Sequence, residues 1–258
     1  MKNDGGNGTK DTGTTGTHNE TQNEAMELAQ LRAQTAAIRR SQAVIEFDLE
    51  GTILDANDNF LSAMGYTLEE VRGKHHSLFV EPEFKGSAEY RQLWTDLNQG
   101  KFKSGEFKRI GKGGREVWIQ ASYNPILDPN GTPVKVVKFA SDVTEAKMQS
   151  ADHAGQLDAI RKSQAVIEFE LDGTIIDANE NFLSVMGYTL EEVSGKHHSI
   201  FIEPEMRRSA EYKQFWVDLN KGKFKSARFK RIGKDGVEVW IQASYNPILD
   251  PDGRVFKV

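Results

Sequence analysis

The chain has 258 residues, a formal net charge of −5 and no cysteine. The lack of cysteine excludes disulfides, thiolate metal sites and a thiolate nucleophile, and the acidic balance argues against a nucleic-acid partner, because phosphate binding needs a clustered basic surface. No apolar run approaches the roughly 20 residues that span a bilayer, and the polar N-terminus lacks a signal-peptide core, so we expect a cytoplasmic protein without a membrane segment.

Residues 38–136 and 160–258 are two copies of one sequence, offset by 122 positions without a gap. Of the 99 paired positions, 75 are identical and 24 differ. A repeat of about 100 residues has the size of an independent domain, so the chain is predicted to hold two domains and not a solenoid. Copy one continues beyond residue 136, whereas copy two ends at Val258, and we therefore expect the natural protein to continue.

The N-terminal 40 residues divide into two segments. Residues 1–24 are mostly Gly, Thr, Asn and acidic residues with almost nothing to bury, which predicts a disordered tail. Residues 25–40 are predicted to form a flanking helix, because apolar residues recur there at helical spacing. The residues of this stripe are Leu28, Leu31, Thr35 and Ile38.

Copy one reads as two strands, several short helices and three strands. The predicted strands are residues 42–48, 52–56, 104–110, 115–127 and 133–141. Gly65 is expected to end a helix over residues 58–64, Thr67 to Glu70 forms a capping box, and Ser87 caps a further helix. This order predicts an α+β domain, a five-stranded antiparallel sheet with short helices on one face.

A second helix, over residues 145–162, is expected to link the copies. Asp142 and Glu145 have the spacing of a capping box, so a strand would feed directly into this helix. Such a junction can pass a displacement from a sheet into a helix, and a plain spacer between domains is the alternative.

Several separated motifs now resemble PAS domains with their trailing PAC segment. In copy one they are residues 56–60, 64–70, 112–118, 122–125 and 142–144, and copy two repeats all but the last. The resemblance implies PAS domains over 41–144 and 163–258, the second truncated in its last strand. It also implies a homodimer formed through the flanking helices. The pair resembles the input half of soluble bacterial chemoreceptor-like proteins, of the aerotaxis or biofilm-dispersion type, whose C-terminal signalling domain is absent from this chain.

The expected function is cytoplasmic signal sensing without enzymatic activity. A ligand, redox or oxygen cue would pass through the helical linkers to an output, in chemotaxis-type signal transduction. The alternative is a cofactor-free scaffold that dimerises and holds a partner protein. A Soret or flavin absorption band in the purified protein would separate the two.

The identity of a cofactor stays open between haem b, FAD and none. His76 and His198 are candidate ligands of haem iron, against the alternative of capping or loop hydrogen bonds. Haem-binding relatives commonly place the ligand on the following helix, near Ser87 and Ser209. Flavin-binding aerotaxis relatives carry a tryptophan where this chain has Lys103 and Lys225, so that part of the resemblance fails.

The other candidate site residues also occur in pairs, one in each copy. Trp94 and Trp216 are either core residues or lids over a cofactor. Strand alternation places Ile119 and Tyr123, with Ile241 and Tyr245, on the pocket face. We expect Arg109 and Arg231 to pair with carboxylates, with an anionic ligand group as the alternative. Asn57 and Asn179 either contact a ligand or cap the next helix.

Overall fold

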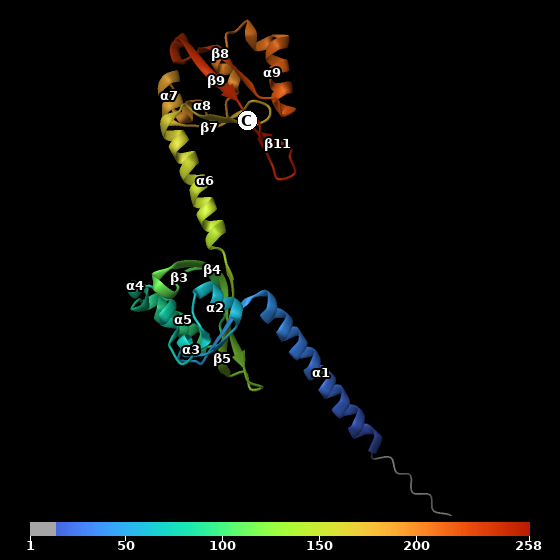
Figure 1. Ribbon diagram of the computed structural model, residues 1–258. Coiled ribbons are helices and arrows are strands. Elements are labelled where there is room, and N and C mark those ends of the chain that lie inside the picture. The colour runs from blue at the N-terminus through green and yellow to red at the C-terminus, as the bar shows by residue number, and fades with distance from the viewer. Residues whose placement is uncertain (1–13) are drawn as a thin grey trace, which may run out of the picture. The chain divides into compact units, whose positions relative to one another are not determined.

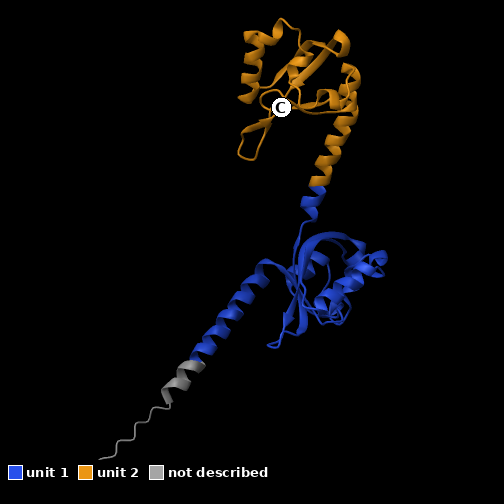
Figure 2. Ribbon diagram, turned by 180° about the vertical axis from the view of Figure 1, so that it is seen from behind, with its two compact units in different colours: residues 1–149 blue, residues 150–258 orange. Residues whose placement is uncertain are grey.

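A computed structural model describes the backbone of residues 14–258 and the side chains of residues 22–258. The chain divides into two compact units, residues 1–149 and 150–258, called unit 1 and unit 2 (Figure 2). Residues 1–13 of the expected disordered tail lie outside the described residues. None of the helices in the described part of the chain is both long and apolar enough to cross a membrane.

The first helix, α1, covers Thr14–Ser41 and so begins earlier than the predicted residue 25. Extending a formed helix by one residue is far easier than nucleating a new one, which lets the polar residues 14–24 continue the helix. The predicted stripe faces solvent, since Leu28 is 48% exposed, Leu31 59% and Ile38 43%. Within the described residues of unit 1, nothing packs over this stripe.

Unit 1 contains a five-stranded antiparallel sheet in the order β2-β1-β5-β4-β3 (Figure 1). Its strands are β1 (Ala43–Phe47), β2 (Ile53–Ala56), β3 (Lys103–Ile110), β4 (Glu116–Leu127) and β5 (Pro133–Asp142). The last strand lies in the middle and pairs with both β1 and β4. The predicted fold class is confirmed for this unit.

Short helices follow the first hairpin of unit 1, and local sequence signals place their ends. The helices are α2 (Asp58–Met64), α3 (Leu68–Val71), η1 (His76–Phe79), α4 (Pro82–Lys85) and α5 (Ala88–Asn98). Gly65 ends α2 in the left-handed conformation, Thr67 and Glu70 form the predicted capping box, and Ser87 caps α5. The core lies between these helices and the sheet, built from residues such as Phe47 and Phe60.

Unit 2 repeats the order of elements but not the continuous sheet. Its strands are β6 (Ile167–Phe169), β7 (Ile175–Ala178), β8 (Lys225–Ile232), β9 (Glu238–Tyr245), β10 (Ile248–Leu249) and β11 (Val255–Lys257). They form three separate two-stranded ladders, so a five-stranded sheet is present only in unit 1. In unit 1, residues 137–142 join β1 to β4, and this chain has no residues at the equivalent positions. Val258 begins that pairing through two hydrogen bonds with Phe169, of 2.8 and 3.0 Å.

The helices of unit 2 match those of unit 1, and a long helix precedes them. They are α7 (Glu180–Met186), α8 (Leu190–Val193), η3 (His198–Phe201), η4 (Met206–Arg208) and α9 (Ala210–Asn220). The linker helix α6 covers Thr144–Ser163, close to the predicted 145–162. The Asp142 carboxylate accepts a hydrogen bond from the Thr144 N–H, at 2.9 Å. The expected capping box is not closed, because the Glu145 carboxylate accepts from Gln149 instead.

Candidate functional site

His76 is the centre of a buried polar cluster inside unit 1. It begins the short helix η1 and is fully buried. Its Nδ1 lies 2.8 Å from the hydroxyl of Tyr90 on α5, and its Nε2 lies 3.0 Å from the hydroxyl of Tyr123 on β4. The imidazole therefore connects the helix α5 to the inner strand β4 through one ring.

The imidazole of His76 and the two tyrosine hydroxyls are held in their uncharged forms. Burial, with the charges of Lys138 and Arg109 nearby, lowers the pKa of His76 well below its usual value. Burial also raises the pKa of Tyr90 to about 12 and raises the pKa of Tyr123. A neutral imidazole carries one N–H, so one phenol donates to the ring and the other accepts from it.

The predicted haem ligands have no open ring nitrogen in this structure. His198 in unit 2 repeats the arrangement, with Tyr212 at 2.9 Å and Tyr245 at 3.1 Å. Iron would have to displace a tyrosine hydroxyl from either imidazole, deep inside a packed core. The residues as arranged do not fit a haem. The capping role falls to His75, whose Nδ1 accepts a hydrogen bond from the Ser77 N–H.

Arg109 points into the same core, and the expected carboxylate partner is missing. It is 3% exposed, donates to the Lys108 carbonyl at 2.7 Å and to the Tyr123 hydroxyl at 3.0 Å, and leaves its buried Nε without a partner. Arg231 in unit 2 repeats these contacts with Lys230 and Tyr245. Among the described side chains neither arginine forms an ion pair, so the prediction of structural pairing is wrong.

Lys138 is a site residue that the sequence reasoning missed. It lies on β5, is 1% exposed, and places its Nζ 4.6 Å from the ring centre of Tyr123. Burial, with the charge of Arg109 close by, lowers its pKa well below the usual value. The signal was present in the strand alternation, because Val136 and Ala140 on the same face are also buried.

Trp94 packs as a core residue at the edge of this cluster. Its ring lies 5.8 Å from Phe47 and 5.6 Å from His76, and its buried indole N–H has no acceptor. Trp216 occupies the same place in unit 2, against Phe169 and His198. Trp216 is therefore part of the packed interior of unit 2, and Trp94 is half-buried against the core of unit 1.

The inward face of β4 lies where strand alternation placed it. Ile119 and Tyr123 are 2% and 0% exposed. In unit 2, Ile241 and Tyr245 line a cavity of about 10 Å³, a volume near that of one water. Arg231 and His198 complete its polar lining.

Asn57 is a structural cap with its hydrogen-bonding capacity filled by the backbone. Its Oδ1 accepts from the N–H groups of Val44 and Phe60, and its Nδ2 donates to the carbonyls of Arg39 and Gln42, all within 3.1 Å. The amide thus joins the end of α1 to β1 and α2. Asn179 makes the equivalent four bonds, so the capping alternative holds at both positions.

A second contact network joins the sheet of unit 1 to the start of α6. The Thr144 hydroxyl accepts from the Trp118 N–H at 2.9 Å, and the Val143 N–H donates to the Trp118 carbonyl at 2.8 Å. Lys147 on α6 lies over the Trp118 ring at 5.4 Å and pairs with Glu106 on β3 at 2.5 Å. Residues on β3 and β4 therefore hold the first turn of the linker helix.

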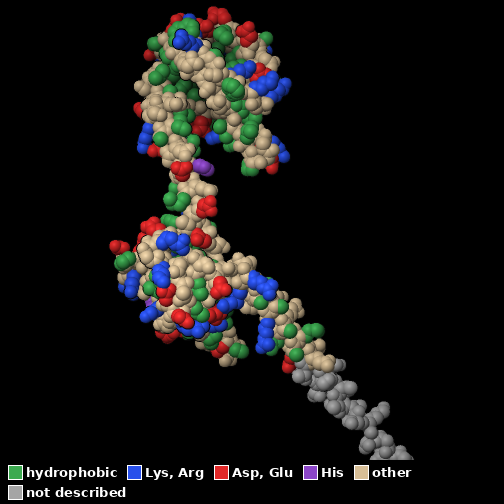
Figure 3. All heavy atoms as spheres, in the orientation of Figure 1, with side chains coloured by type: hydrophobic (Ala, Val, Ile, Leu, Met, Phe, Trp, Pro, Cys, Tyr) green, Lys and Arg blue, Asp and Glu red, His purple; other side chains and the backbone are tan. Residues whose placement is uncertain are grey.

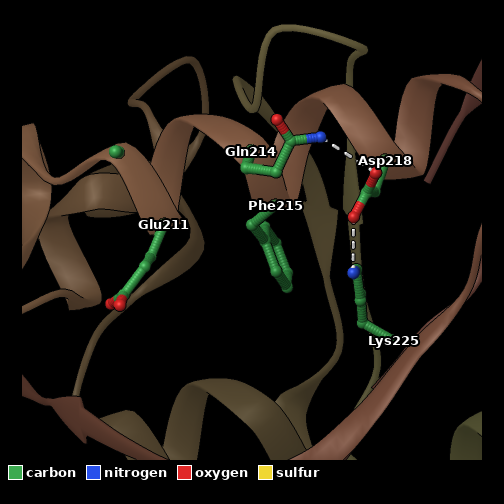
Figure 4. A pocket seen from close by; sticks show the side chains of 6 residues that line it. Glu211, Gln214, Phe215, Asp218 and Lys225 are labelled. Atoms are coloured by element: carbon green, nitrogen blue, oxygen red, sulfur yellow. Dashed lines mark hydrogen bonds and ion pairs between the residues drawn. The ribbon is translucent and has the colours of Figure 1, made fainter.

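A wider hollow lies on the surface of unit 2, between α9 and β8 (Figure 4). Its volume is about 550 Å³, and Phe215 points into it. Asp218 accepts hydrogen bonds from Lys225 at 2.6 Å and from Gln214 at 3.0 Å, and these two contacts lower the pKa of Asp218 to about 2. The polar groups that line this hollow already bind one another, which makes the hollow a weaker candidate for a ligand site than the buried clusters.

Comparisons with known proteins point to one family. Residues 53–140 and 175–258 match the sequence profile of the PAS fold. The chain is 43% identical to the biofilm dispersion protein BdlA of Pseudomonas aeruginosa over 223 residues, 86% of this chain and 54% of that protein. It is 34% identical to the aerotaxis receptor of Escherichia coli over 80 residues, 31% of this chain and 16% of the receptor.

The chain spans about half the length of BdlA and a smaller part of the aerotaxis receptor. Among solved structures, a PAS domain of a protein from Colwellia psychrerythraea is 24% identical, with a TM-score of 0.40 over 45% of this chain and 98% of that domain.

Proposed function

The chain belongs to the PAS fold family, and on that premise we propose that it is a cytoplasmic sensory module without enzymatic activity, working in chemotaxis-type signal transduction. A cue changes the packing around the cluster of His76, Tyr123 and Arg109. The change passes along β4 into α6 and reaches an output domain outside this chain. Such transmission requires the cue to bind two arrangements of the domain with different affinity.

The observation that carries this proposal is the continuity of β4 from the cluster to the linker. Tyr123 bonds to His76 and Arg109 in the core, and Trp118, five residues earlier on the same strand, bonds to the Thr144 hydroxyl. A shift of β4 at Tyr123 therefore acts directly on the first turn of α6. Thr144 is the first residue of α6, so its bond to Trp118 joins the strand directly to the linker helix.

Loss of the Thr144 hydroxyl is expected to uncouple the linker from the core. The chain has no cysteine, so a single Met148→Cys substitution on α6 gives a unique site for a spin label. Tyr123→Phe removes the hydroxyl at the centre of the cluster, and we expect it to change the mobility of the label in electron paramagnetic resonance spectra. In a Thr144→Val background this response is expected to be largely lost.

The matched control is Thr95→Val, which removes an exposed hydroxyl that bonds only to a carbonyl within α5. It is expected to leave the response of the label to Tyr123→Phe unchanged. If Tyr123→Phe leaves the mobility of the label unchanged in the otherwise unaltered chain, transmission through this junction is contradicted.

We further propose that the chain forms a homodimer through its flanking helices. Apolar side chains along α1 and α6 are open to solvent (Figure 3), among them Leu31 at 59% and Leu157 at 62% exposure. On α1 they follow helical spacing, so a second copy of the same helix is their natural partner. Aligned flanking helices would also give the two chains of the dimer a common path for the signal.

A charge in the middle of the α1 stripe is expected to weaken this dimer. Leu31→Asp places a carboxylate between Leu28 and Ile38, and we expect the dimer dissociation constant to rise by about ten-fold or more. Sedimentation equilibrium of the full chain measures it. Gln30→Asp adds the same charge at the neighbouring position outside the stripe and is expected to leave the constant nearly unchanged. Equal effects of both variants would place the interface elsewhere.

A further inference from the structure

Unit 1 buries two basic side chains around Tyr123 without a carboxylate between them. Arg109 is 3% exposed and Lys138 is 1% exposed. No carboxylate among the described side chains pairs with either of them. The neighbouring Lys108, which points to the other face of β3, binds both Glu81 and Glu116. The acidic groups near β3 thus neutralise the outward lysine and leave the inward arginine alone.

Burying a basic group without an acidic partner is expensive, either as an uncompensated charge or as the lowered pKa of Lys138, so its persistence needs a reason. Removing one partner of a buried ion pair leaves a basic group in this situation. The Nζ of Lys138 lies 4.6 Å from the ring centre of Tyr123 and 5.9 Å from that of Phe60. These contacts compensate a charge less well than a carboxylate does. The missing member of the set is an anion.

Two basic side chains meet at Tyr123 in the core. The Nε of Arg109 is buried without a partner, and the rest of its guanidinium is bound to Tyr123 and to the Lys108 carbonyl. Lys138 lies over the same Tyr123 ring. Tyr123 therefore contacts both a guanidinium with an unpartnered N–H and the amine of Lys138, and the rings of Phe107 and Phe60 lie next to these two groups.

We propose that the interior of unit 1, between Arg109, Lys138 and Tyr123, is a binding site for a small carboxylate with a short apolar tail. A guanidinium and an ammonium together match the oxygens of a carboxylate, and the aromatic walls accept the tail. The proposal rests on the sensory function above and names the class of its ligand. Binding moves the amine of Lys138 from the Tyr123 ring to the anion, beside which it is held as an ammonium, and this supplies the second arrangement that signalling requires.

Size limits the ligand to a few heavy atoms. The equivalent interior of unit 2, where the chain has no counterpart of Lys138, holds a cavity of only about 10 Å³. A carboxylate in unit 1 therefore gains its space mainly from the movement of the lysine side chain. Acetate, propionate and pyruvate are the appropriate probes.

The test is calorimetric titration of the full chain with acetate, propionate and pyruvate, at constant ionic strength. At least one of them is expected to bind, and Lys138→Met is expected to weaken that binding by about ten-fold or more. Lys135→Met is the matched control, since Lys135 lies on the same strand but pairs with Glu46 at the surface. It is expected to bind as the unaltered chain does.

A second measurement needs no ligand. Lys138→Met removes a buried amine that has no acidic partner and replaces it with an apolar side chain of similar size, so the variant without ligand is expected to melt several degrees higher than the unaltered chain. Lys135→Met is expected to melt at or slightly below the original temperature. A lower melting temperature for Lys138→Met would show that the buried lysine already has its partner, and would overturn the proposal.

Other outcomes are equally decisive. No heat of binding with any of the three carboxylates overturns the ligand class, as does equal binding by Lys138→Met. Equal binding of chloride or phosphate would reduce the site to an unselective anion site. The spin-label experiment uses no anion, so its success beside a failed titration leaves the sensory function standing. The reverse result would describe a binding domain that does not signal.

Discussion

Replacing His76 with alanine is expected to lower the free energy of unfolding of unit 1 by about 4 kcal/mol. The substitution removes a fully buried ring and leaves a cavity beside Phe47 and Trp94. It also takes away the imidazole that the hydroxyls of Tyr90 and Tyr123 contact, and of these two only Tyr123 keeps a further hydrogen bond, from Arg109. Each buried group left unpaired adds its own desolvation cost to that of the cavity.

The neighbouring histidine is the control for this prediction. His75 is exposed, and its ring bonds to the Glu50 carbonyl and caps η1. His75→Ala is therefore expected to cost about 1 kcal/mol, the usual value of a lost cap. Calorimetry of the full chain measures the free energy of unfolding of each variant. His198→Ala perturbs unit 2 instead of unit 1 and so shows which unfolding transition belongs to which unit. A loss below about 1 kcal/mol for His76→Ala would show that the core closes over the missing ring.

Replacing Gly51 with alanine is expected to lower the stability of unit 1 by about 3 kcal/mol. Gly51 has a φ of +89°, which disfavours any residue with a Cβ. An added Cβ would also lie 2.8 Å from Cζ2 of Trp94 and 2.8 Å from Nε2 of His75. The indole cannot yield without disturbing its contacts with Phe47 and His76.

Gly73 separates the two contributions. Its φ is +75°, but an added Cβ meets no atom within 4 Å. Gly73→Ala is therefore expected to cost about 1 kcal/mol, from the backbone conformation alone. Urea unfolding followed by tryptophan fluorescence measures both variants. Equal losses would show that the turn at Gly51 moves away from Trp94 at little cost.

The conservation of this contact between the two copies supports the interpretation. Gly173 has a φ of +92°, and its added Cβ would lie 2.8 Å from Trp216 and from His197. The buried histidine, the tryptophan beside it and the glycine that leaves room for the indole thus recur together in both units. They are His76, Trp94 and Gly51 in unit 1 and His198, Trp216 and Gly173 in unit 2.

Much of the fold follows from short-range signals in the sequence. The alternation on β4, the left-handed Gly65 and the Ser87 cap each depend on residues within a few positions of one another. Such interactions form in the same way whatever the rest of the chain does. They predicted the helices and strands of unit 1 to within one or two residues at most ends.

The interior of the site was only partly predictable. Sequence reasoning named His76, Tyr123 and Arg109 and put Tyr123 on the inward face, but it gave the arginine a carboxylate partner. Whether a buried charge finds a partner depends on residues that meet across the sheet. Lys138 shows the same limit. Strand alternation indicates that its side chain points inward, but the sequence does not show that no carboxylate pairs with it.

The sequence by itself determined that this chain holds two copies of one α+β domain, and it marked where most of their helices and strands begin and end. Only the tertiary structure decided which of two adjacent histidines enters the core and that Arg109 and Lys138 share an interior without an acid. The reason is physical: the first set depends on contacts within a few residues, whereas the second depends on β5 settling between β1 and β4, about 90 and 20 residues away.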